Sequence, residues 1–324
     1  MLLKNALNRF TRACKNCEGS HTMNRVLENN RLRVTVSDDG AELVSVWDKK
    51  RNAERIWRGD KAVWGRHAPV LFPFVGKVAD GRYSYRGKQY NMTSHGFARD
   101  RVFELVEMGE LSVTHVLKWS DDTLTVYPFK FVLYVKHSLE NADADSVNVQ
   151  WRVVNEADNG EVMLYGIGGH PAFTFPDNEQ AVDCSLRINS AYGAAKSEEE
   201  PLKYHLLNES GCVDMSREYE LDMPQGSVKI TEDMFDKDAL IVLDNQVNYI
   251  ELLDAHGKPY IGMACEGFPY FGIWSKKVDE FICLEPWYGI ADVAGHEGDL
   301  EKKAGMQRLG AGESASYDYV VEFY

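Results

Sequence analysis

The sequence predicts an all-β fold, an antiparallel sandwich or barrel, and two observations carry this prediction. Apolar and polar residues alternate with a period of two in segment after segment, which is typical of strands with one buried face. Helical periodicity is nearly absent, and its best candidate is the short stretch 230–238. Many strands joined by short turns are typical of sandwiches and barrels. No proline- or glycine-rich linker and no repeat divides the chain, so we expect one β domain over residues 23–324.

The first predicted element is a hairpin. The segment 31–37 alternates leucine and valine with polar neighbours, the turn DDG follows at 38–40, and 41–47 returns. The same alternation recurs further along the chain, where clusters of glycine, asparagine, aspartate and serine separate the segments. These later predicted strands are 129–137, 146–154, 161–167, 248–254, 258–265 and 316–324.

Composition and charge limit the classes of partner. Of the 324 residues, 44% are hydrophobic and 27% are charged, an ordinary balance for a globular protein with a sizeable core. The formal net charge is −14 at pH 7. This charge argues against nucleic acid or an anionic membrane surface as the main partner, because both attract a basic surface. No run approaches the roughly 18 apolar residues of a membrane span.

The N-terminal segment 1–22 is expected to lie outside the fold. Residues 19–23 read GSHTM, which resembles a cloning scar ending in a start methionine, so we interpret 1–22 as an expression tag or a disordered leader. The segment lacks the continuous apolar core of a signal peptide. Six cysteines are too sparse for a disulfide framework, and the pair Cys14 and Cys17 has no second pair to complete a zinc site. The predicted compartment is the cytoplasm.

Three segments break the succession of strands and turns. The first, 67–100, is rich in aromatic residues and ends in HGFARD, where glycine after histidine permits an unusual backbone and close approach by a ligand. The second, 164–176, reads LYGIGGHPAFTFP. Its glycine pair permits torsions closed to other residues, and Pro171 biases His170 toward an extended conformation. This local sequence therefore predicts that the imidazole of His170 is held in one direction.

The third segment, 280–292, reads EFICLEPWYGIAD and contains a carboxylate among apolar residues. Alternation places Cys283 and Glu285 on one face of a strand, and Pro286 is expected to end the strand's hydrogen-bond ladder. A buried carboxylate is costly, so Glu285 either bridges to a structural arginine or serves a reaction. Desolvation raises a glutamate's pKa toward the range of a general base. Trp287 could stack on the apolar face of a sugar ring or simply pack in the core.

Other catalytic constellations are missing. The sequence has no GxSxG elbow, no Walker A loop, no GxGxxG that opens a helix and no HExxH. Two histidines and a glutamate could form a zinc site. However, His95, His170 and Glu285 lie on three separate segments without short ligand spacing, so we expect no metal and no other cofactor.

Taken in order, three motifs resemble the aldose 1-epimerase (galactose mutarotase) family, and its LacX-like branch most of all. They are FPFVGK…GRYSYRGKQY…HGFARD, then GGHPAF, then CLEPW, and the resemblance runs from about Asn24 to the C-terminus. The resemblance implies a large antiparallel β-sandwich, the supersandwich. It also implies that Glu285 is the general base and that His95 and His170 are the two histidines of the catalytic site.

The resemblance also implies sugar-binding positions, which fall on Arg99 and Asp238. Galactose mutarotases carry an Asn-Arg pair shortly after the glycine of the first segment, whereas this chain reads GKVADGRY. Either Lys77 or Arg82 takes that arginine's role here, or no residue does. This departure leaves the identity of the sugar open.

The implied activity is interconversion of the α and β anomers of a hexose, a small-molecule sugar, by acid and base catalysis without a cofactor. A carboxylate takes the proton of the C1 hydroxyl and an imidazolium protonates the ring oxygen. Three alternatives stay open. A hexose-6-phosphate mutarotase would use Lys77, Arg82 and Arg99 as a phosphate clamp. A non-catalytic carbohydrate-binding protein would need no acid and base, and a glycoside hydrolase or lyase would need a further catalytic group, for which Asp238 is the candidate.

Overall fold

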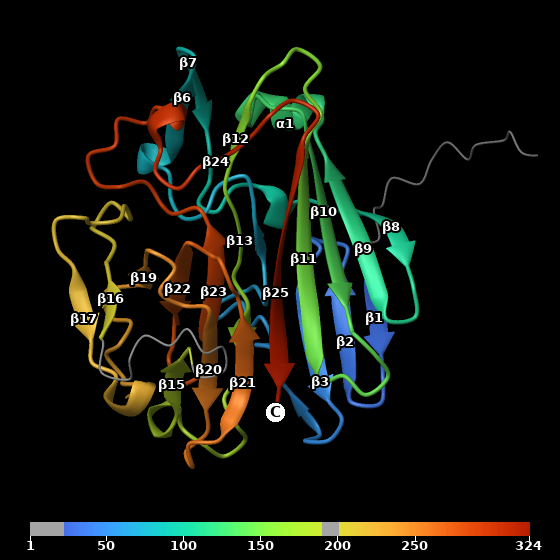
Figure 1. The fold of residues 1–324 in the computed structure, drawn as a ribbon, viewed down its shortest axis with the longest axis vertical. Coiled ribbons are helices and arrows are strands. Elements are labelled where there is room, and N and C mark those ends of the chain that lie inside the picture. The colour runs from blue at the N-terminus through green and yellow to red at the C-terminus, as the bar shows by residue number, and fades with distance from the viewer. Residues whose placement is uncertain (1–22, 190–200) are drawn as a thin grey trace, which may run out of the picture.

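The structure is a computed structural model that describes residues 23–189 and 201–324 (Figure 1). The predicted tag or leader, 1–22, lies outside the described residues. Within the described ranges the regular secondary structure is almost all strand, the strands pair antiparallel, and the sheets pack against one another. The prediction of an all-β sandwich is confirmed.

The largest sheet has nine strands among the described residues and forms one layer of the sandwich. Its spatial order is β18-β15-β20-β21-β25-β11-β10-β9-β8. The bounds are β8 Glu104–Met108, β9 Ser112–Lys118, β10 Phe131–Ser138, β11 Ser146–Asn155, β15 Ser185–Ile188, β18 Ser227–Lys229, β20 Tyr249–Leu253, β21 Pro259–Ala264 and β25 Ser314–Phe323. Every strand predicted between 129 and 154 and from 248 onward belongs to this sheet.

A second sheet carries the residues of the third sequence segment. Its order is β19-β22-β23-β13-β5, with β14 also paired to β23. The bounds are β5 Val70–Leu71, β13 Ile167–Gly169, β14 Ala172–Phe173, β19 Leu240–Val242, β22 Tyr270–Trp274 and β23 Ile282–Tyr288. The strand predicted at 161–167 is thus divided between β13 and the separate strand β12 (Met163–Tyr165).

The remaining strands form a four-stranded sheet and three two-stranded pairs over the part of the chain described. The four-stranded sheet contains the predicted N-terminal hairpin: β1 Asn24–Glu28, β2 Leu32–Ser37, β3 Leu43–Asp48 and β4 Ala53–Glu54. The pairs are β6 Arg82–Tyr85 with β7 Lys88–Asn91, β12 with β24 Gln307–Leu309, and β16 Leu202–Tyr204 with β17 Tyr219–Leu221.

Helical structure is short and lies elsewhere than predicted. The stretch 230–238 forms turns, because its amide groups bond three residues back and Asp238 takes a left-handed φ of 74°. The α-helix is α1, Asp121–Val126, which a capping box between Ser120 and Thr123 starts. The 3₁₀ turns are η1 Ala79–Gly81, η2 Ala98–Asp100, η3 Ala181–Asp183, η4 Pro224–Gly226 and η5 Leu300–Lys302. In the parts of the chain that the structure describes, no helix has the length and apolar character to cross a bilayer.

The hydrophobic core lies between the sheets. The alternation on β2 buries Leu32 and Val34, and the alternation on β11 buries Val149 and Trp151 in the same cluster. Complete burial of each such side chain contributes roughly 1.5–3 kcal/mol. This shared core fixes the smaller sheets against the nine-stranded layer.

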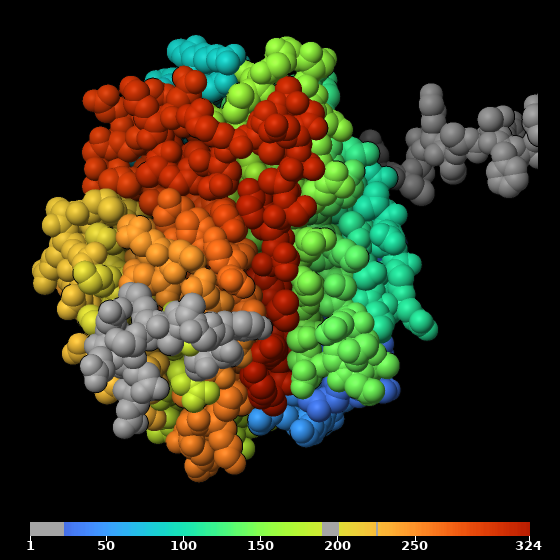
Figure 2. All heavy atoms as spheres, viewed as in Figure 1, coloured from blue at the N-terminus to red at the C-terminus, as the bar shows by residue number. Residues whose placement is uncertain are grey.

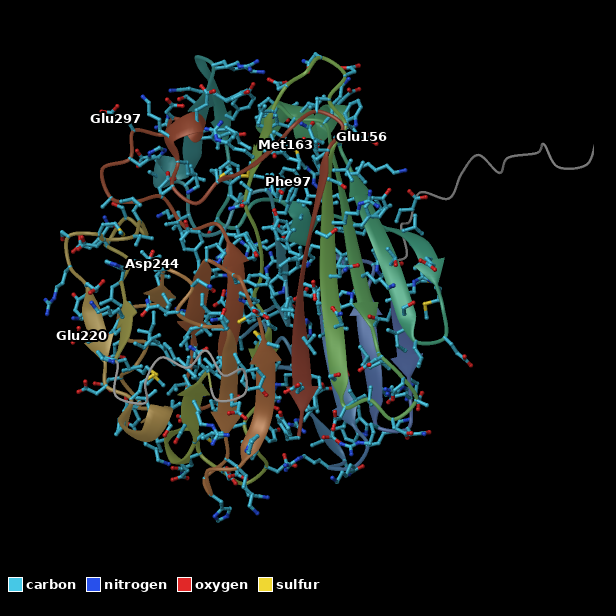
Figure 3. The ribbon with its side chains drawn as sticks, viewed as in Figure 1. Phe97, Glu156, Met163, Glu220, Asp244 and Glu297 are labelled. Atoms are coloured by element: carbon cyan, nitrogen blue, oxygen red, sulfur yellow. The ribbon has the colours of Figure 1, made fainter. Side chains whose placement is uncertain are left out.

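The views of the molecule agree with this arrangement. In Figure 2, β25 forms a red band between β11, in green, and β21, in orange. Figure 3 shows Phe97 and Met163 inside the molecule, where both are buried. The labelled acidic residues Glu220, Asp244 and Glu297 are exposed at the surface.

Strand β23 continues through Pro286, so the prediction that this proline ends the ladder is wrong. Pro286 is paired with Phe271 of β22, and the strand runs to Tyr288. The amide of Leu284 donates to the carbonyl of Pro171, and amides two residues apart on a strand point the same way. Pro286 therefore faces the interruption between β13 and β14, where its missing donor costs no ladder bond.

Candidate active site

A cleft of about 860 Å³ lies beside the second sheet and gathers most of the predicted site residues. Side chains from β22, β23 and β19, from β17 (Tyr219–Leu221) and from the loops around them line it. The predicted residues that it brings together are Lys77, His95, Arg99, His170, Asp238, Glu285 and Trp287.

Strand register places the two central groups opposite each other. Strand β13 pairs Gly168 with Trp287 of β23, and β14 pairs Ala172 with Cys283 of the same strand. The chain between β13 and β14 therefore crosses β23 level with Glu285. His170 is held there by its amide, which donates to the carbonyl of Pro69 (3.1 Å).

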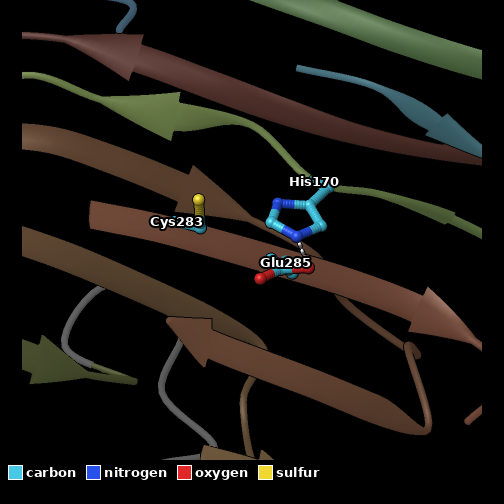
Figure 4. A group of neighbouring side chains, drawn as sticks. All are labelled: His170, Cys283 and Glu285. Atoms are coloured by element: carbon cyan, nitrogen blue, oxygen red, sulfur yellow. Dashed lines mark ion pairs between the residues drawn. The ribbon is translucent and has the colours of Figure 1, made fainter. Parts of the chain in front are cut away.

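The imidazole of His170 and the carboxylate of Glu285 are in contact (Figure 4). Nε2 of His170 lies 3.2 Å from Oε2 of Glu285, and the two residues are 7% and 1% exposed. No arginine or lysine approaches Glu285 as an ion-pair partner among the described residues. The structural alternative for this carboxylate, a bridge to an arginine, is therefore not what the structure shows.

The glycine pair before His170 provides space, and neither glycine uses a left-handed torsion. A Cβ on Gly168 would come within 2.6 Å of the Trp287 indole, and one on Gly169 within 3.0 Å of the Tyr319 hydroxyl. The sequence predicted that this pair adopts torsions closed to other residues. That prediction is wrong, because neither Gly168 nor Gly169 has a positive φ. Close packing of the sheet around the site requires the pair.

His95 is held by the backbone of Gly76. Its amide donates to the carbonyl of Gly76 (2.8 Å), and its Nδ1 accepts from the amide of Gly76 (3.2 Å). His95 has a φ of 65° and Gly96 a φ of 72°, as the predicted unusual backbone requires. Since Nδ1 accepts, the ring carries its proton on Nε2 and can donate it to a ligand.

Arg99 lies on η2 at the cleft without a carboxylate partner among the ion pairs of the described residues. Its Nη2 donates to the carbonyl of Ser94 (2.7 Å), and its Nε is buried without a hydrogen-bond partner. Burial, together with the charge of Arg66, lowers the pKa of Arg99 to about 10. The guanidinium therefore stays charged at neutral pH and retains donors for a ligand's oxygens.

The structure separates the two candidates for the family arginine's role. Lys77 follows β5 and lines the cleft, where its side chain lies over Gly211. Arg82 starts β6 and lines a different hollow of about 270 Å³, together with Gln89 and His296. Arg82 is therefore not brought to the site, since the residues that line its hollow do not line the cleft.

Trp287 forms part of the cleft wall beside Glu285. Its indole occupies the space above Gly168 of β13, the register partner of Trp287, and above Gly272 of β22, the register partner of Glu285. The indole is 4% exposed, and its Nε1 has no hydrogen-bond partner. Trp287 therefore both packs in the core and lines the cleft.

Two tryptophans at the site were missed by sequence reasoning. The ring of Trp64 stacks on His170 with centroids 4.9 Å apart and planes at 27°, and Trp274 meets the same imidazole edge-on at 5.5 Å. Both line the cleft. Trp64 lies three residues before the segment 67–100, but a lone tryptophan in a loop is equally typical of core packing.

Burial moves the pKa values of the central pair in opposite directions. Burial raises the pKa of Glu285 well above its usual value, and the charge of Asp238 adds to this. Burial lowers the pKa of His170 to about 3, and the charge of Arg99 acts in the same direction. Burial and neighbouring His170 and Arg99 also place the pKa of His95 well below its usual value. The contacting pair Glu285 and His170 thus holds one proton in total over a wide pH range.

A possible metal-binding group exists, but it differs from the one considered in the sequence. His170, Cys283 and Glu285 offer ligand atoms that lie within 4.8 Å of one another (Figure 4). Burial and the charge of Glu285 raise the pKa of the Cys283 thiol well above its usual value, so the thiolate that zinc binds is disfavoured. That the protein works without a metal stays a prediction.

Comparison with known proteins identifies the family. The sequence profile described as Aldose 1-epimerase matches residues 24–241. This chain belongs to the aldose 1-epimerase family. The protein LacX of Lactococcus lactis subsp. lactis is 27% identical over 291 residues, which cover 87% of this chain and 93% of LacX. The predicted resemblance, including its LacX-like branch, is confirmed.

Solved structures place the fold in the same family. A galactose mutarotase related enzyme from Lactobacillus acidophilus has a TM-score of 0.84 at 33% identity and covers 93% of this chain and 97% of its own. A galactose mutarotase-like protein from Lactobacillus casei has a TM-score of 0.81 at 29% identity, with 93% and 100% covered. The β-sandwich of this aldose 1-epimerase family member is therefore of the galactose mutarotase type.

Proposed function

We propose that this protein is an aldose 1-epimerase, an isomerase that interconverts the α and β anomers of a free hexose. One observation carries the proposal: a carboxylate and an imidazole meet at 3.2 Å on the floor of a cleft and share no other ionic partner among the described residues. Family membership supports the same class of reaction. The cleft supplies oxygen-binding donors on His95 and Arg99 and the indole of Trp287.

In the proposed mechanism the sugar enters with its C1 hydroxyl and ring oxygen at the pair. Glu285 as carboxylate takes the C1 hydroxyl proton, and His170 as imidazolium gives a proton to the ring oxygen, so the C1–O5 bond breaks. Rotation about C1–C2 and the reverse transfers close the ring as the other anomer. Transfer of the shared proton from Glu285 to His170 prepares this state without changing the net charge of the pair. Positioned proton transfers of this kind contribute ~10²–10⁴-fold in rate.

Polarimetry tests the proposal directly. Freshly dissolved α-glucose and α-galactose should reach their equilibrium rotation faster with the protein than without it, and the rate should scale with protein concentration. The same rates are expected after treatment with EDTA, because no step uses a metal. Relaxation at the buffer rate with every aldose tried would contradict the enzyme and leave a non-catalytic carbohydrate-binding protein as the better description.

A hexose 6-phosphate is the second candidate substrate, and the lysines of the cleft favour it. Lys77, Lys237 and Lys276 line the cleft from three separate elements and have no ion-pair partner among the described residues. Acidic side chains, Asp238 and Asp214 among them, line the same cleft, so its charge is mixed. We therefore place neutral hexoses first. A value of kcat/KM at least ten times higher for glucose 6-phosphate than for glucose would reverse this order.

The proposed compartment is the cytoplasm. Four cysteines, Cys184, Cys212, Cys265 and Cys283, are free and buried. Free thiols of this kind persist in reducing compartments. The proposed partner is a small-molecule sugar.

A further inference from the structure

Trp64 has an unusual place among the aromatic residues of the site. It lies on the loop between β4 and β5, where its amide donates to the carbonyl of Asp60 (2.8 Å) and its carbonyl accepts from Nε1 of Trp57 (2.8 Å). Its ring stacks on His170 at 4.9 Å and on Phe281 of the β23 region at 5.5 Å. The loop is thus anchored at Trp64 by the rings of Trp57 and Phe281, and the Trp64 indole also contacts the imidazole of His170.

The imidazole of His170 lacks the hydrogen bond that usually orients a catalytic histidine. Such rings are commonly fixed by a carboxylate or carbonyl that accepts from Nδ1. Here Nδ1 of His170 is buried and has no hydrogen-bond partner among residues 23–189 and 201–324. Nε2 has the contact with Glu285, which must open when a sugar enters. Packing therefore has to hold the plane of this ring.

Within the part of the chain that the structure describes, three rings contact the imidazole, and one of the three is stacked on it. Trp64 stacks at an interplanar angle of 27°, whereas His95 and Trp274 meet the imidazole at 72° and 88°. An edge contact allows the imidazole to rotate against it more easily than a stacked face does. The stacked indole also favours the positively charged imidazolium through its π face.

We infer that Trp64 is a positioning residue for the proposed reaction: its stacked indole holds the imidazole of His170 in the plane in which Nε2 addresses Glu285 and the sugar's ring oxygen. Trp64 exchanges no proton in this role and acts only through His170. The inference rests on the proposed function for its kinetic consequence, but the orientation of His170 can be measured without turnover.

Substitution of Trp64 separates positioning from simple packing. Trp64→Leu removes the flat face, and we expect kcat to fall about ten- to a hundredfold, the scale of a small misplacement of reacting groups, with KM changed less than about threefold. Trp64→Phe keeps a ring and should stay within about threefold of wild-type kcat. Val63→Ala is the matched control, because Val63 packs against the same cluster but has no ring to stack on His170. It should retain wild-type kcat.

A double substitution tests whether the effect passes through His170. In a His170→Asn background, Trp64→Leu should cause no further loss of kcat, because the group that it positions is already absent. An equal further loss there, or a Trp64→Leu protein with wild-type kcat, would overturn the inference. An equal loss of kcat in Val63→Ala would also overturn it, since general damage to the loop would then explain the result.

Nuclear magnetic resonance of the histidine side chains keeps the inference separate from the proposed function. With ¹⁵N-labelled protein, Trp64→Leu should change the Nε2 and Nδ1 signals of His170 and their titration, while Trp64→Phe should largely preserve them. Unchanged His170 signals in Trp64→Leu would overturn the positioning role. Absence of mutarotation in the wild-type protein would refute the proposed function alone, and the signals would still decide the role of Trp64.

Discussion

At the scale of single residues, the chemistry available to the site depends on Glu285, His170 and the one proton that this pair holds. Burial alone would leave Glu285 protonated and His170 neutral, because each pKa moves away from the charged form. Their contact at 3.2 Å makes the alternative, a carboxylate beside an imidazolium, reachable by moving a single proton. In the proposed mechanism, a group that cannot exchange a proton therefore cannot replace either residue.

Replacement of the carboxylate gives the sharpest test at this scale. Glu285→Gln keeps the shape and burial of the side chain but removes the basic oxygen, so kcat should fall about a hundredfold or more. His170→Asn should lower kcat comparably, because the ring oxygen loses its proton donor. Polarimetry measures the rates, and quenching of the cleft tryptophans measures retained sugar binding. A Glu285→Gln protein with more than about a tenth of wild-type kcat would refute the general-base role.

The pH dependence of kcat should follow the titration of the pair Glu285 and His170 rather than that of an ordinary histidine. At low pH the pair gains a second proton on His170, whose pKa burial lowers to about 3. At high pH the pair loses its last proton from Glu285, whose pKa burial raises well above the usual value. The kcat measured by polarimetry should therefore stay nearly constant through about pH 6.5, where a free histidine titrates. An acid limb with an apparent pKa near that value would contradict the expectation.

At the scale of elements, the register of β23 explains why His95, His170 and Glu285, which the sequence predicted for one site, line the same cleft. Alternation placed Glu285 inward, and the motifs located His95 and His170, which the sheet then brings together. The parts that failed depend on contacts between distant strands. Pro286 is tolerated because the neighbouring chain is interrupted at its level, and the role inferred for Trp64 depends on its place against His170. Neither fact is visible along a single strand.

The two glycines beside Trp287 should be sensitive to the smallest addition. A Cβ on Gly272 would overlap the six-membered ring of the Trp287 indole, which is enclosed by the sheet. Gly272→Ala should therefore lower the free energy of unfolding by about 1–3 kcal/mol and raise KM, because the indole beside Glu285 must move. Gly109→Ala is the control, since only the Ser112 side chain lies near, at 3.2 Å, and should move aside. Urea unfolding measures both, and equal stabilities would contradict the packing argument.

At the scale of the whole molecule, a buried ion pair joins three chain segments around the cleft. Nζ of Lys303 lies 2.8 Å from Oδ1 of Asp292, and both side chains are almost fully buried. The other carboxylate oxygen accepts from the amide of Ala79 (2.8 Å), while the backbone of Asp292 bonds to Lys77 and to Val213. Segments far apart in the sequence, near 78, 213 and 292, are thus fixed to one another. The sequence offered no sign of this pair, since both partners lie outside strands and helices, where no periodic pattern marks them.

Removal of the cation alone should destabilise the fold strongly. Lys303→Met leaves the carboxylate of Asp292 buried without a charge partner, and breaking a buried pair in this way costs about 3–5 kcal/mol. The double variant Lys303→Met with Asp292→Asn removes the stranded charge but keeps an oxygen for the amide of Ala79, so it should be more stable than the single variant by about 1 kcal/mol or more. Urea unfolding of the three proteins measures this order. A Lys303→Met protein as stable as wild type would show that this ion pair does not hold the cleft walls together. Recovery of stability in the double variant would show that the loss in the single variant comes from the unpaired carboxylate of Asp292.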